Sequence, residues 1–228
     1  MTDTPTTSPP RGRFVSFEGG EGAGKSTQIK ILADRLEAEG KRVIVTREPG
    51  GSPGAEIIRH VVLSGMGKLL GPEAETLLFA AARDDHVHAV IAPALEQGIW
   101  VLCDRFSDST RAYQGRLGHV SPELLNAMER VTIGRLKPDL TVILDIPVSI
   151  GMRRAAARRG NDVPDRFEAE GIAFHQGLRD AFRQIAADEP QRCVLIDANA
   201  DSKIVSNNIW GVLRRRLLTP SNHEVTSA

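Results

Sequence analysis

The stretch Gly19-Gly20-Glu21-Gly22-Ala23-Gly24-Lys25-Ser26 fits the phosphate-binding pattern G-x-x-x-x-G-K-[ST] without a mismatch. The apolar residues 14–17 precede it, and apolar side chains at helical spacing follow it over residues 29–36. A strand, a glycine-rich loop and a helix in this order are the setting in which the pattern binds phosphate. The stretch therefore indicates an α/β fold and directs the chemistry to phosphate groups.

Each part of this loop has a physical role in holding a chain of phosphates. Glycines let successive backbone N–H groups point at one anion, and the helix that begins near Gly24 adds the positive end of its dipole. Lys25 can reach the outer phosphates, and the Ser26 hydroxyl can bind Mg²⁺. We predict that Lys25 is catalytic and that Ser26 is a metal ligand. The predicted donor-nucleotide site consists of Gly19, Gly20, Glu21, Gly22, Ala23, Gly24, Lys25, Ser26 and Thr27.

The composition is that of a globular protein with a sizeable core, since 41% of the 228 residues are hydrophobic and 25% are charged. The 29 basic and 29 acidic residues cancel, so no overall field attracts nucleic acid or a membrane surface, and anion binding must be local. We expect a single domain at 12–218 with a lid at about 153–168. Disordered tails are expected at 1–11 and 219–228.

The cysteines and the apolar segments indicate the cellular compartment. Cys103 and Cys193 lie inside apolar runs, which favours buried thiols in a reducing compartment over a disulfide. No apolar stretch approaches the length of a transmembrane helix, and the N-terminus lacks the apolar core of a secretion signal. We therefore expect a cytoplasmic protein that binds neither membranes nor nucleic acid.

Strand-like and helix-like segments alternate along the chain. The strand-like runs are β-branched and almost continuously apolar, as expected for strands buried on both faces. Their alternation with helices predicts a five-stranded parallel sheet with helices on both faces. The predicted strands are 14–17, 43–46, 99–103, 140–144 and 193–196, and the predicted helices are about 24–39, 53–64, 72–97, 121–136, 147–159, 167–187 and 201–217.

Charged residues follow every predicted strand, where the ligands of parallel sheets bind. Asp104-Arg105 follows the third strand: Asp104 can hold Mg²⁺, and the planar Arg105 guanidinium suits a second phosphate, so we predict that Arg105 is catalytic. A solvated surface pair is the alternative for these two residues. For Glu18 and Asp197, which follow the first and last strands, helix or turn capping is the favoured interpretation.

Two further segments supply arginines. The turn 46–51 (Thr-Arg-Glu-Pro-Gly-Gly) presents Arg47, and Arg59 on the next helix is either an acceptor-phosphate ligand or a solvated charge. The segment 153–168 carries five arginines around a loop with Gly160 and Pro164 as possible hinges. A basic flap of this kind can close over phosphates, and we predict that Arg158 or Arg159 is catalytic.

These segments together resemble the thymidylate kinase family of nucleoside monophosphate kinases. The resemblance spans about residues 12–217, and its most specific parts are Arg-Glu-Pro-Gly-Gly at 47–51 and Ala-Tyr-Gln-Gly at 112–115. Other matching segments are 14–19, Asp-Arg-Phe at 104–106, Leu-Thr-Val-Ile-Leu-Asp-Ile-Pro at 140–147 and Asp-Arg-Phe-Glu at 165–168. The resemblance implies a nucleoside monophosphate kinase fold, Mg²⁺-dependent transfer of the ATP γ-phosphoryl to dTMP, and a cytoplasmic homodimer.

The resemblance also implies roles for residues that spacing alone does not assign. It places Phe79 against thymine and Arg83 at a thymine carbonyl, and both lie on one helix face at spacing i, i+4. It places Tyr113 beneath the deoxyribose and Arg153 against adenine. As in bacterial members, the loop lacks an arginine, so the lid must supply one. The implied dTMP-binding residues are Glu18, Arg47, Pro49, Arg59, Phe79, Arg83, Arg105, Ser109, Thr110, Tyr113 and Gln114.

Two other classes of protein remain open from the residues alone. A deoxynucleoside kinase would phosphorylate a 5′-hydroxyl and would use a carboxylate base near the sugar, a role that Glu18 could fill. A nucleotide-switch ATPase would act by binding and conformational change. The base-reading motif of GTPases is missing from the sequence, which gives the switch class less support.

Overall fold

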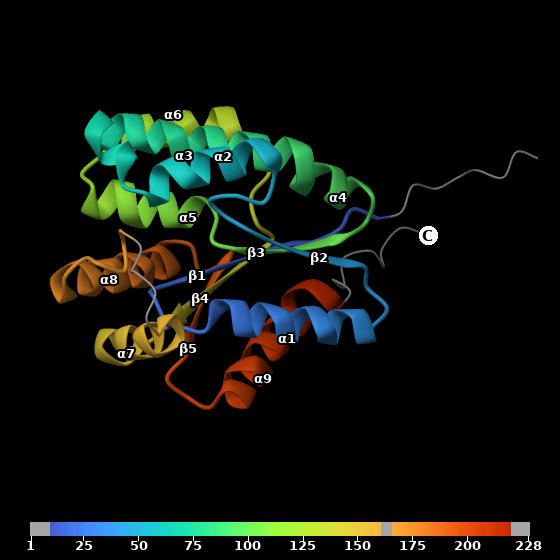
Figure 1. The fold of residues 1–228 in the computed structure, drawn as a ribbon. Helices are drawn as coiled ribbons and strands as arrows, with labels where there is room; N and C mark the ends of the chain where they lie inside the picture. Colours follow the sequence, from blue (N-terminus) through green and yellow to red (C-terminus); the bar gives the residue numbers. More distant parts are fainter. Residues whose placement is uncertain (1–9, 161–165, 220–228) are drawn as a thin grey trace, which may run out of the picture.

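The computed structural model describes residues 10–160 and 166–219, which form a five-stranded, wholly parallel sheet. The strand order is β2-β3-β1-β4-β5, so β1, which leads into the phosphate-binding loop, lies in the centre (Figure 1). The predicted fold class is thus confirmed. The strands are β1 (Phe14–Gly19), β2 (Val43–Arg47), β3 (Trp100–Asp104), β4 (Leu140–Asp145) and β5 (Cys193–Asp197).

Alternate residues of the central strand face two different cores. Val15 and Phe17 pack against α1 (Lys25–Ala38) and α9 (Ser202–Leu213). Phe14 points to the opposite face, where it packs with residues of η2 (Val87–Ile91) and α4 (Ala92–Glu96). Burial of both faces explains why each strand is almost continuously apolar.

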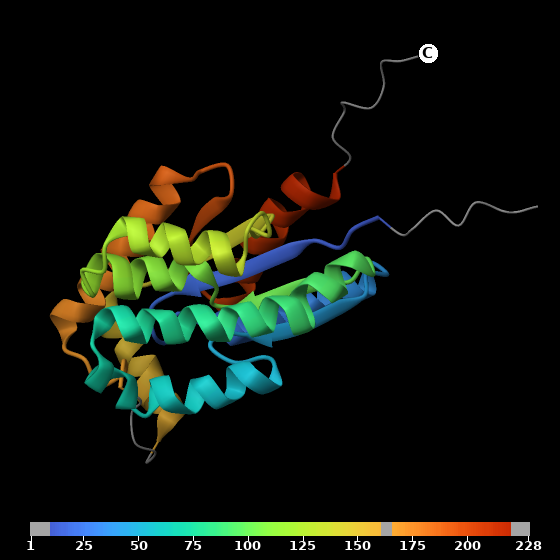
Figure 2. The same ribbon diagram turned by 90° about the horizontal axis from the view of Figure 1, so that it is seen from above.

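The second face of the sheet is covered by a broad set of helices, which Figure 2 shows from above. α3 (Pro72–His86) runs through the middle of this layer, with α2 (Pro53–Leu63) and α6 (Pro122–Thr132) packed on it. The layer continues through α5 (Ser107–Thr110) and η3 (Arg111–Leu117) to α8 (Ile172–Asp188). The remaining helical segments are η1 (Met66–Leu70), α7 (Val148–Arg159) and η4 (Arg214–Leu218).

Three expectations about the helices need correction. The helical segment at 107–117 was not predicted, because it begins with Ser-Asp-Ser-Thr and is fixed by long-range polar contacts rather than by an apolar repeat. The helix expected from residue 167 begins at Ile172, since 166–168 bind side chains of other elements. The helix expected to reach residue 136 ends at Thr132.

The ends of the described chain and the two cysteines can be compared with the expectations from the sequence. Arg11 lies 3.4 Å from the Asp139 carboxylate, so it belongs to the folded body and not to a tail. The rest of the expected tails, at 1–9 and 220–228, lies outside the described residues. Cys103 and Cys193 are free and buried, as expected. Within the described residues, no helix combines the length and the apolar character needed to cross a membrane.

Candidate active site

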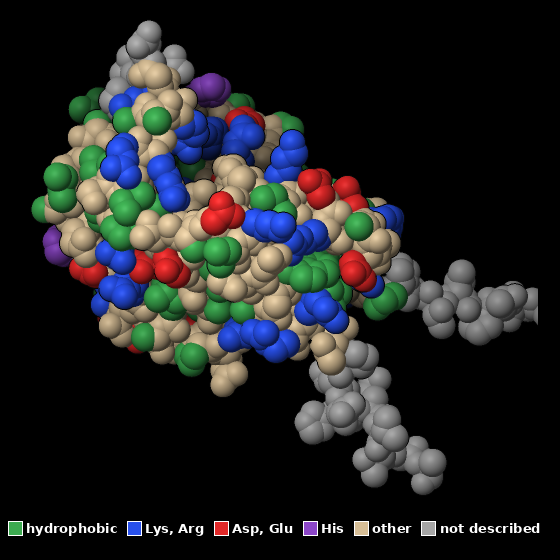
Figure 3. Space-filling model, turned by 90° about the horizontal axis from the view of Figure 1, so that it is seen from below, with side chains coloured by type: hydrophobic (Ala, Val, Ile, Leu, Met, Phe, Trp, Pro, Cys, Tyr) green, Lys and Arg blue, Asp and Glu red, His purple; other side chains and the backbone are tan. Residues whose placement is uncertain are grey.

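A cavity of about 380 Å³ lies beyond the carboxyl ends of the central strands. It connects the phosphate loop to a pocket between α3 and η3, and basic side chains gather beside a hollow in the upper part of Figure 3. Of the predicted site residues, the cavity is lined by Glu21, Gly22, Ala23, Gly24, Lys25, Ser26, Thr27, Arg47, Pro49, Arg59, Phe79, Arg83, Asp104, Arg105, Ser109, Thr110, Tyr113, Gln114 and Arg158.

The phosphate loop has the backbone that its glycines allow. Gly22 and Gly24 have φ values of 66° and 91°, in the left-handed region that side chains disfavour, and α1 starts directly after Gly24. The Lys25 ammonium donates to the carbonyl oxygens of Gly19 and Gly20, each at 3.1 Å. Burial, together with the Arg105 charge, lowers the pKa of Lys25. A cation thus lies against the loop, where phosphate oxygens would gather.

The loop is in direct backbone contact with α7. A Cβ atom at Gly22 would lie 2.0 Å from the Gly151 carbonyl oxygen, and one at Gly151 would lie 2.5 Å from the Glu21 carbonyl oxygen. Neither position has room for a side chain, because backbone atoms cannot move aside. The helix that carries Arg158 is therefore held against the donor end of the cavity.

Ser26 and Asp104 meet at the end of β3. The Ser26 hydroxyl donates to the Asp104 carboxylate at 2.8 Å, and both residues line the cavity. One carboxylate, one hydroxyl and substrate phosphates are the oxygen ligands that Mg²⁺ takes in phosphate-transfer sites. Among the described residues, no group of three or more His, Cys, Asp or Glu side chains is placed to hold a metal ion. The donor set fits a magnesium ion held mainly by substrate and water, not an all-protein cage.

Arg105 is held in an unusual backbone conformation. Its φ is 71°, and its backbone N–H donates to Phe17 O at 2.8 Å. Its guanidinium donates to Glu21 at 2.5 Å and lies 5.3 Å from the centre of the Tyr113 ring. Burial opposes ionisation of Glu21, but the charges of Arg105 and Lys25 outweigh it and lower the pKa of Glu21 to about 2. The Arg105–Glu21 pair joins the phosphate loop to the pocket between α3 and η3.

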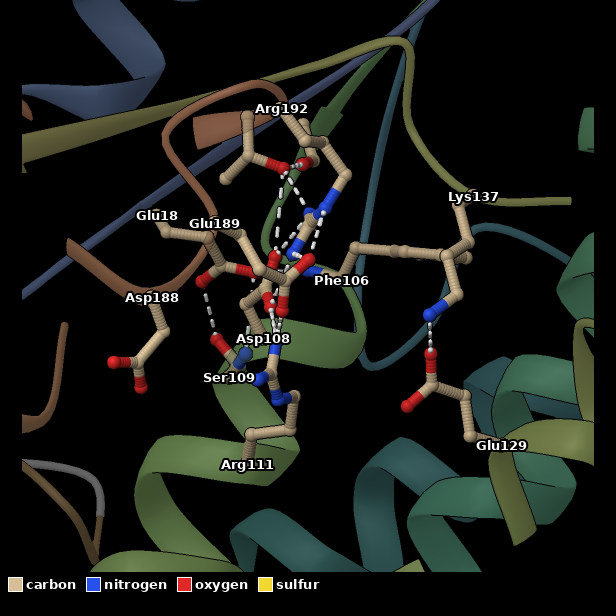
Figure 4. Close-up of polar contacts among 12 residues, drawn as sticks. Glu18, Phe106, Asp108, Ser109, Arg111, Glu129, Lys137, Asp188, Glu189 and Arg192 are labelled. Atoms are coloured by element: carbon tan, nitrogen blue, oxygen red, sulfur yellow. Dashed lines mark hydrogen bonds and ion pairs between the residues drawn. The ribbon is translucent and has the colours of Figure 1, made fainter. Parts of the chain in front are cut away.

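Glu18 lies behind this turn, not in the cavity. Its fully buried carboxylate accepts hydrogen bonds from the backbone N–H groups of Phe106 (2.8 Å) and Ser109 (3.2 Å) and from the Ser109 hydroxyl (2.7 Å; Figure 4). Burial and the neighbouring Asp108 carboxylate raise the pKa of Glu18 to about 7. These contacts match the capping interpretation. The dTMP-binding role given to Glu18 lacks support from its position, because its side chain is enclosed behind the turn.

Sequence reasoning missed a second buried glutamate. Glu48 lies 2.8 Å from Arg83 Nε and 3.2 Å from His86 Nδ1, and all three side chains are almost fully buried. The Arg83 guanidinium also donates to the Thr110 hydroxyl at 3.1 Å. Glu48 therefore orients Arg83, which lines the pocket between α3 and η3. The sequence showed it only as part of a Pro-Gly-Gly turn.

Three of the aromatic side chains that line the pocket come from α3, from η3 and from the segment after α7. Phe79 and Tyr113 line the cavity, as predicted, and the Phe167 ring lies 6.5 Å from Phe79 and 5.0 Å from Tyr113. Phe167 was not predicted as a site residue, although it belongs to one of the matched segments. Arg47 and Arg59 lie at the edge, where Arg47 pairs with Glu56 at 2.9 Å and Arg59 donates to Pro49 O at 2.6 Å.

The two lid arginines differ in position although one carboxylate binds both. Glu168 lies 3.0 Å from Arg158 and 2.9 Å from Arg159. Arg158 is 63% exposed and lines the cavity, whereas Arg159 is 25% exposed and does not. Arg153 is exposed on α7 and also does not line the cavity. Of the predicted lid, Pro164 and Asp165 lie outside the described residues.

Comparisons with known proteins agree with this geometry. The family model described as Thymidylate kinase matches residues 17–209. The chain is 76% identical over 213 residues to the thymidylate kinase of Bradyrhizobium diazoefficiens, with 93% of each chain covered. It is 75% identical over 219 residues to that of Nitrobacter hamburgensis, with 96% of this chain and 95% of the relative covered. A crystal structure of thymidylate kinase from Ehrlichia chaffeensis superimposes with a TM-score of 0.71 at 34% identity, covering 90% and 99% of the two chains.

Proposed function

Because the chain belongs to the thymidylate kinase family and catalyses ATP-dependent phosphorylation of dTMP to dTDP, we propose that its cavity binds the two nucleotides end to end. The phosphate loop 19–27 binds the ATP phosphates, and the pocket between α3 and η3 binds dTMP. Arg105 lies between the two and binds the acceptor phosphate. Family membership decides against a deoxynucleoside kinase and a switch ATPase.

The observation that carries this division is the continuity of the cavity from Lys25 to Phe79. In the reaction, an oxygen of the dTMP 5′-phosphate bonds to the γ-phosphorus as the bond from that phosphorus to the bridging oxygen breaks. The bridging electron pair leaves with ADP. A phosphate oxygen is already anionic, so no general base is required. The chain supplies position and positive charge through Lys25, Arg105 and a lid arginine.

Mg²⁺ fits this site through Ser26 and Asp104, whose oxygens are 2.8 Å apart. When bound, the ion would neutralise charge on the ATP phosphates. Asp104 and Ser26 would hold it at the end of β3, next to Lys25. We assign no other metal-binding residue.

Of the two lid arginines, Arg158 is the better supported catalytic residue. It lines the cavity, and its positive charge helps to lower the pKa of Glu21 in the phosphate loop. Arg159 pairs with the same carboxylate from a position off the cavity lining. Arg159 therefore serves to hold Glu168 in place. For Arg153 we propose only the contact with adenine that the resemblance implies.

The homodimer that the resemblance implies has a candidate surface on the outer helices. Ile57 on α2, Leu77 on α3 and Val131 on α6 are 70%, 54% and 80% exposed, and α3 packs against both other helices. A second copy of the chain would cover these side chains. Sedimentation velocity of Leu77→Asp/Val131→Asp should show a monomer, and Ile204→Asp on the opposite side should leave the dimer intact. A dimeric double variant would contradict this surface.

The compartment and the domain organisation follow the same sequence arguments. We assign the chain to the cytoplasm because its two thiols are buried and free. We treat residues 12–218 as one kinase domain. Limited proteolysis should leave a fragment of this length intact. Rapid cleavage within 12–218 at a site outside the lid would contradict a single domain.

The test of the two-ended cavity is Arg105→Ala. We expect KM for dTMP to rise and kcat/KM for dTMP to fall by about 10²-fold, since a bidentate charge-assisted contact to phosphate is lost. KM for ATP should stay unchanged in a coupled assay with both substrates varied. An equal rise in both KM values would overturn the assignment of Arg105 to the acceptor.

A further inference from the structure

A cluster of charged side chains lies behind the acceptor pocket, and the proposed reaction does not use it. It consists of Asp108, Arg111, Glu189 and Arg192, and we call it the Asp108 cluster (Figure 4). It lies on the sheet face that α5 and α8 cover. None of its members lines the nucleotide cavity.

The centre of the cluster is a two-pronged ion pair. Asp108, in α5, has no exposed surface. Arg192 Nη1 lies 2.6 Å from one carboxylate oxygen of Asp108, and Nη2 lies 3.0 Å from the other. Arg111 adds a third contact at 2.8 Å. Such a pair is strongly destabilising to break, because a buried charge then loses its partner.

Arg192 also ties α5 to the sheet. Its Nη1 donates to the Thr141 hydroxyl of β4 at 2.7 Å, and that hydroxyl lies 2.7 Å from the Ser16 hydroxyl of β1. Its Nε donates to Glu189, the residue that follows α8, at 3.0 Å. One guanidinium therefore connects β4 and the end of α8 to the start of α5, and it reaches β1 through the Thr141 hydroxyl.

The start of α5 is part of the turn that carries Arg105. Glu18 binds the turn through Phe106 and Ser109, and the cluster binds it through Asp108, the residue between these two contacts. A positive φ at a residue other than glycine persists only where surrounding contacts impose it. Arg105, with φ of 71°, depends on both sets of contacts to point into the cavity.

Charge explains why removal of Arg192 alone would disturb the turn. Asp108 and Glu18 are both fully buried, and they repel each other enough to contribute to the raised pKa of Glu18. Without Arg192, only the partly exposed Arg111 would balance Asp108. The first turn of α5 would then move toward water, and Arg105 would move with it.

We propose that Arg192 is a positioning residue for the acceptor phosphate, and that it acts through Asp108 on the turn that carries Arg105. The proposal rests on the proposed role of Arg105. Arg192 itself touches no substrate, because it precedes β5, at the end of that strand away from the nucleotide cavity. Its effect on dTMP binding is indirect and passes through Asp108 and the turn that carries Arg105.

The test compares Arg192→Met with Asp108→Asn/Arg192→Met. The single change leaves a buried carboxylate short of one partner, and we expect KM for dTMP to rise about tenfold while KM for ATP stays unchanged. The double change removes both charges and should restore most of the dTMP affinity. Arg216→Met is the matched control, because Arg216 donates to the carbonyl oxygens of Pro190 and Gln191 in the same segment and the proposal gives it no part in positioning the turn.

Three outcomes would overturn the proposal: an unchanged KM for dTMP, an equal rise for both substrates, or a double variant no better than the single one. If Arg192→Met does not fold, Arg192→Lys replaces it: the lysine still balances the Asp108 charge but loses the two-pronged contact, so we expect a smaller rise in KM for dTMP, and an unchanged KM would overturn the proposal. Arg105→Ala is measured in parallel. A normal KM for dTMP in Arg105→Ala would refute the role of Arg105, whereas a raised one with normal Arg192 variants would refute only the present proposal.

Discussion

The donor and acceptor ends of the cavity are built in different ways. The proposed donor end is one continuous stretch, residues 19–27, of which 21–27 line the cavity and Lys25 lies against the loop backbone. The acceptor end takes side chains from the turn after β2, from α3, from α5 and η3, and from the segment after α7. The first is specified by its own glycines, and the second exists only once distant elements have packed. Variants at the donor end should therefore act directly, and variants at the acceptor end through the packing around them.

Lys25→Ala should give the largest effect and would break the donor end. We expect kcat to fall by about 10³-fold, because a buried cation aimed at the transferred phosphoryl is lost. KM for dTMP should change little. Steady-state assays against Lys30→Ala, an exposed lysine on the same helix, provide the control. Near-normal turnover of Lys25→Ala would show that the loop is not the donor site.

Arg158→Ala should give the next largest effect, and it tests α7, the helix that packs against the phosphate loop and carries Arg158 into the cavity lining. We expect a loss of about 10²-fold in kcat, since one positive charge near the transferred group is removed. Arg159→Ala is the matched comparison, because it shares Glu168 but lies off the cavity lining. Single-turnover rates would separate chemistry from product release. A larger loss in Arg159→Ala would reverse the assignment of the two residues.

Phe79→Ala sharpens the comparison from the acceptor side. Loss of the aromatic face should raise KM for dTMP about tenfold, because one base-stacking contact contributes about 1–3 kcal/mol of binding free energy. KM for ATP should not change. Glu73→Ala, at an exposed position on the same helix, is the control. If KM for both nucleotides rises together, Phe79 acts on the fold and not on thymine.

Glu18→Gln should have the smallest effect on turnover, and its effect on stability depends on pH. The pKa of Glu18 in the folded chain, about 7, lies above its ordinary value of 4.5, so the folded chain keeps a proton that the unfolded chain releases. The free energy of unfolding should therefore fall as pH rises from 4.5 to 7, by on the order of 3 kcal/mol.

Urea unfolding of both proteins across this pH range measures the contribution of Glu18. Glutamine can keep the contacts with Phe106 and Ser109 without an ionisable proton, so the variant should lose less stability over the same range. Identical pH slopes for the two proteins would show that Glu18 does not titrate there.

The sequence predicted the glycine-rich loop after β1 and the sheet well, because both depend on local pattern. The loop motif, the apolar strands and the charges that follow them are each visible within a few residues. The start of α8 was placed too early for the opposite reason. Arg166 and Glu168 look like the first turn of a helix, but they pair with Glu75 and with the lid arginines.

The supports of the acceptor end could not be predicted from the sequence alone. Glu48 is separated from Arg83 by 35 positions, and Asp108 from Arg192 by 84, so no local spacing connects them. Their pairing depends on which sheet face each element covers. Phe167 was visible within a matched segment, but only its distance from Tyr113 shows that it belongs to the pocket.

The contact between Gly22 and Gly151 has a consequence for how this enzyme can change over evolution. The spacing between the loop and the arginine-bearing helix is fixed by main-chain atoms, so no exchange of side chains can lengthen or shorten it by a small step. Even alanine at either position would push the two elements apart. The distance between the phosphate loop and the helix that carries Arg158 is therefore inherited with the fold, and selection can adjust only the lid beyond it.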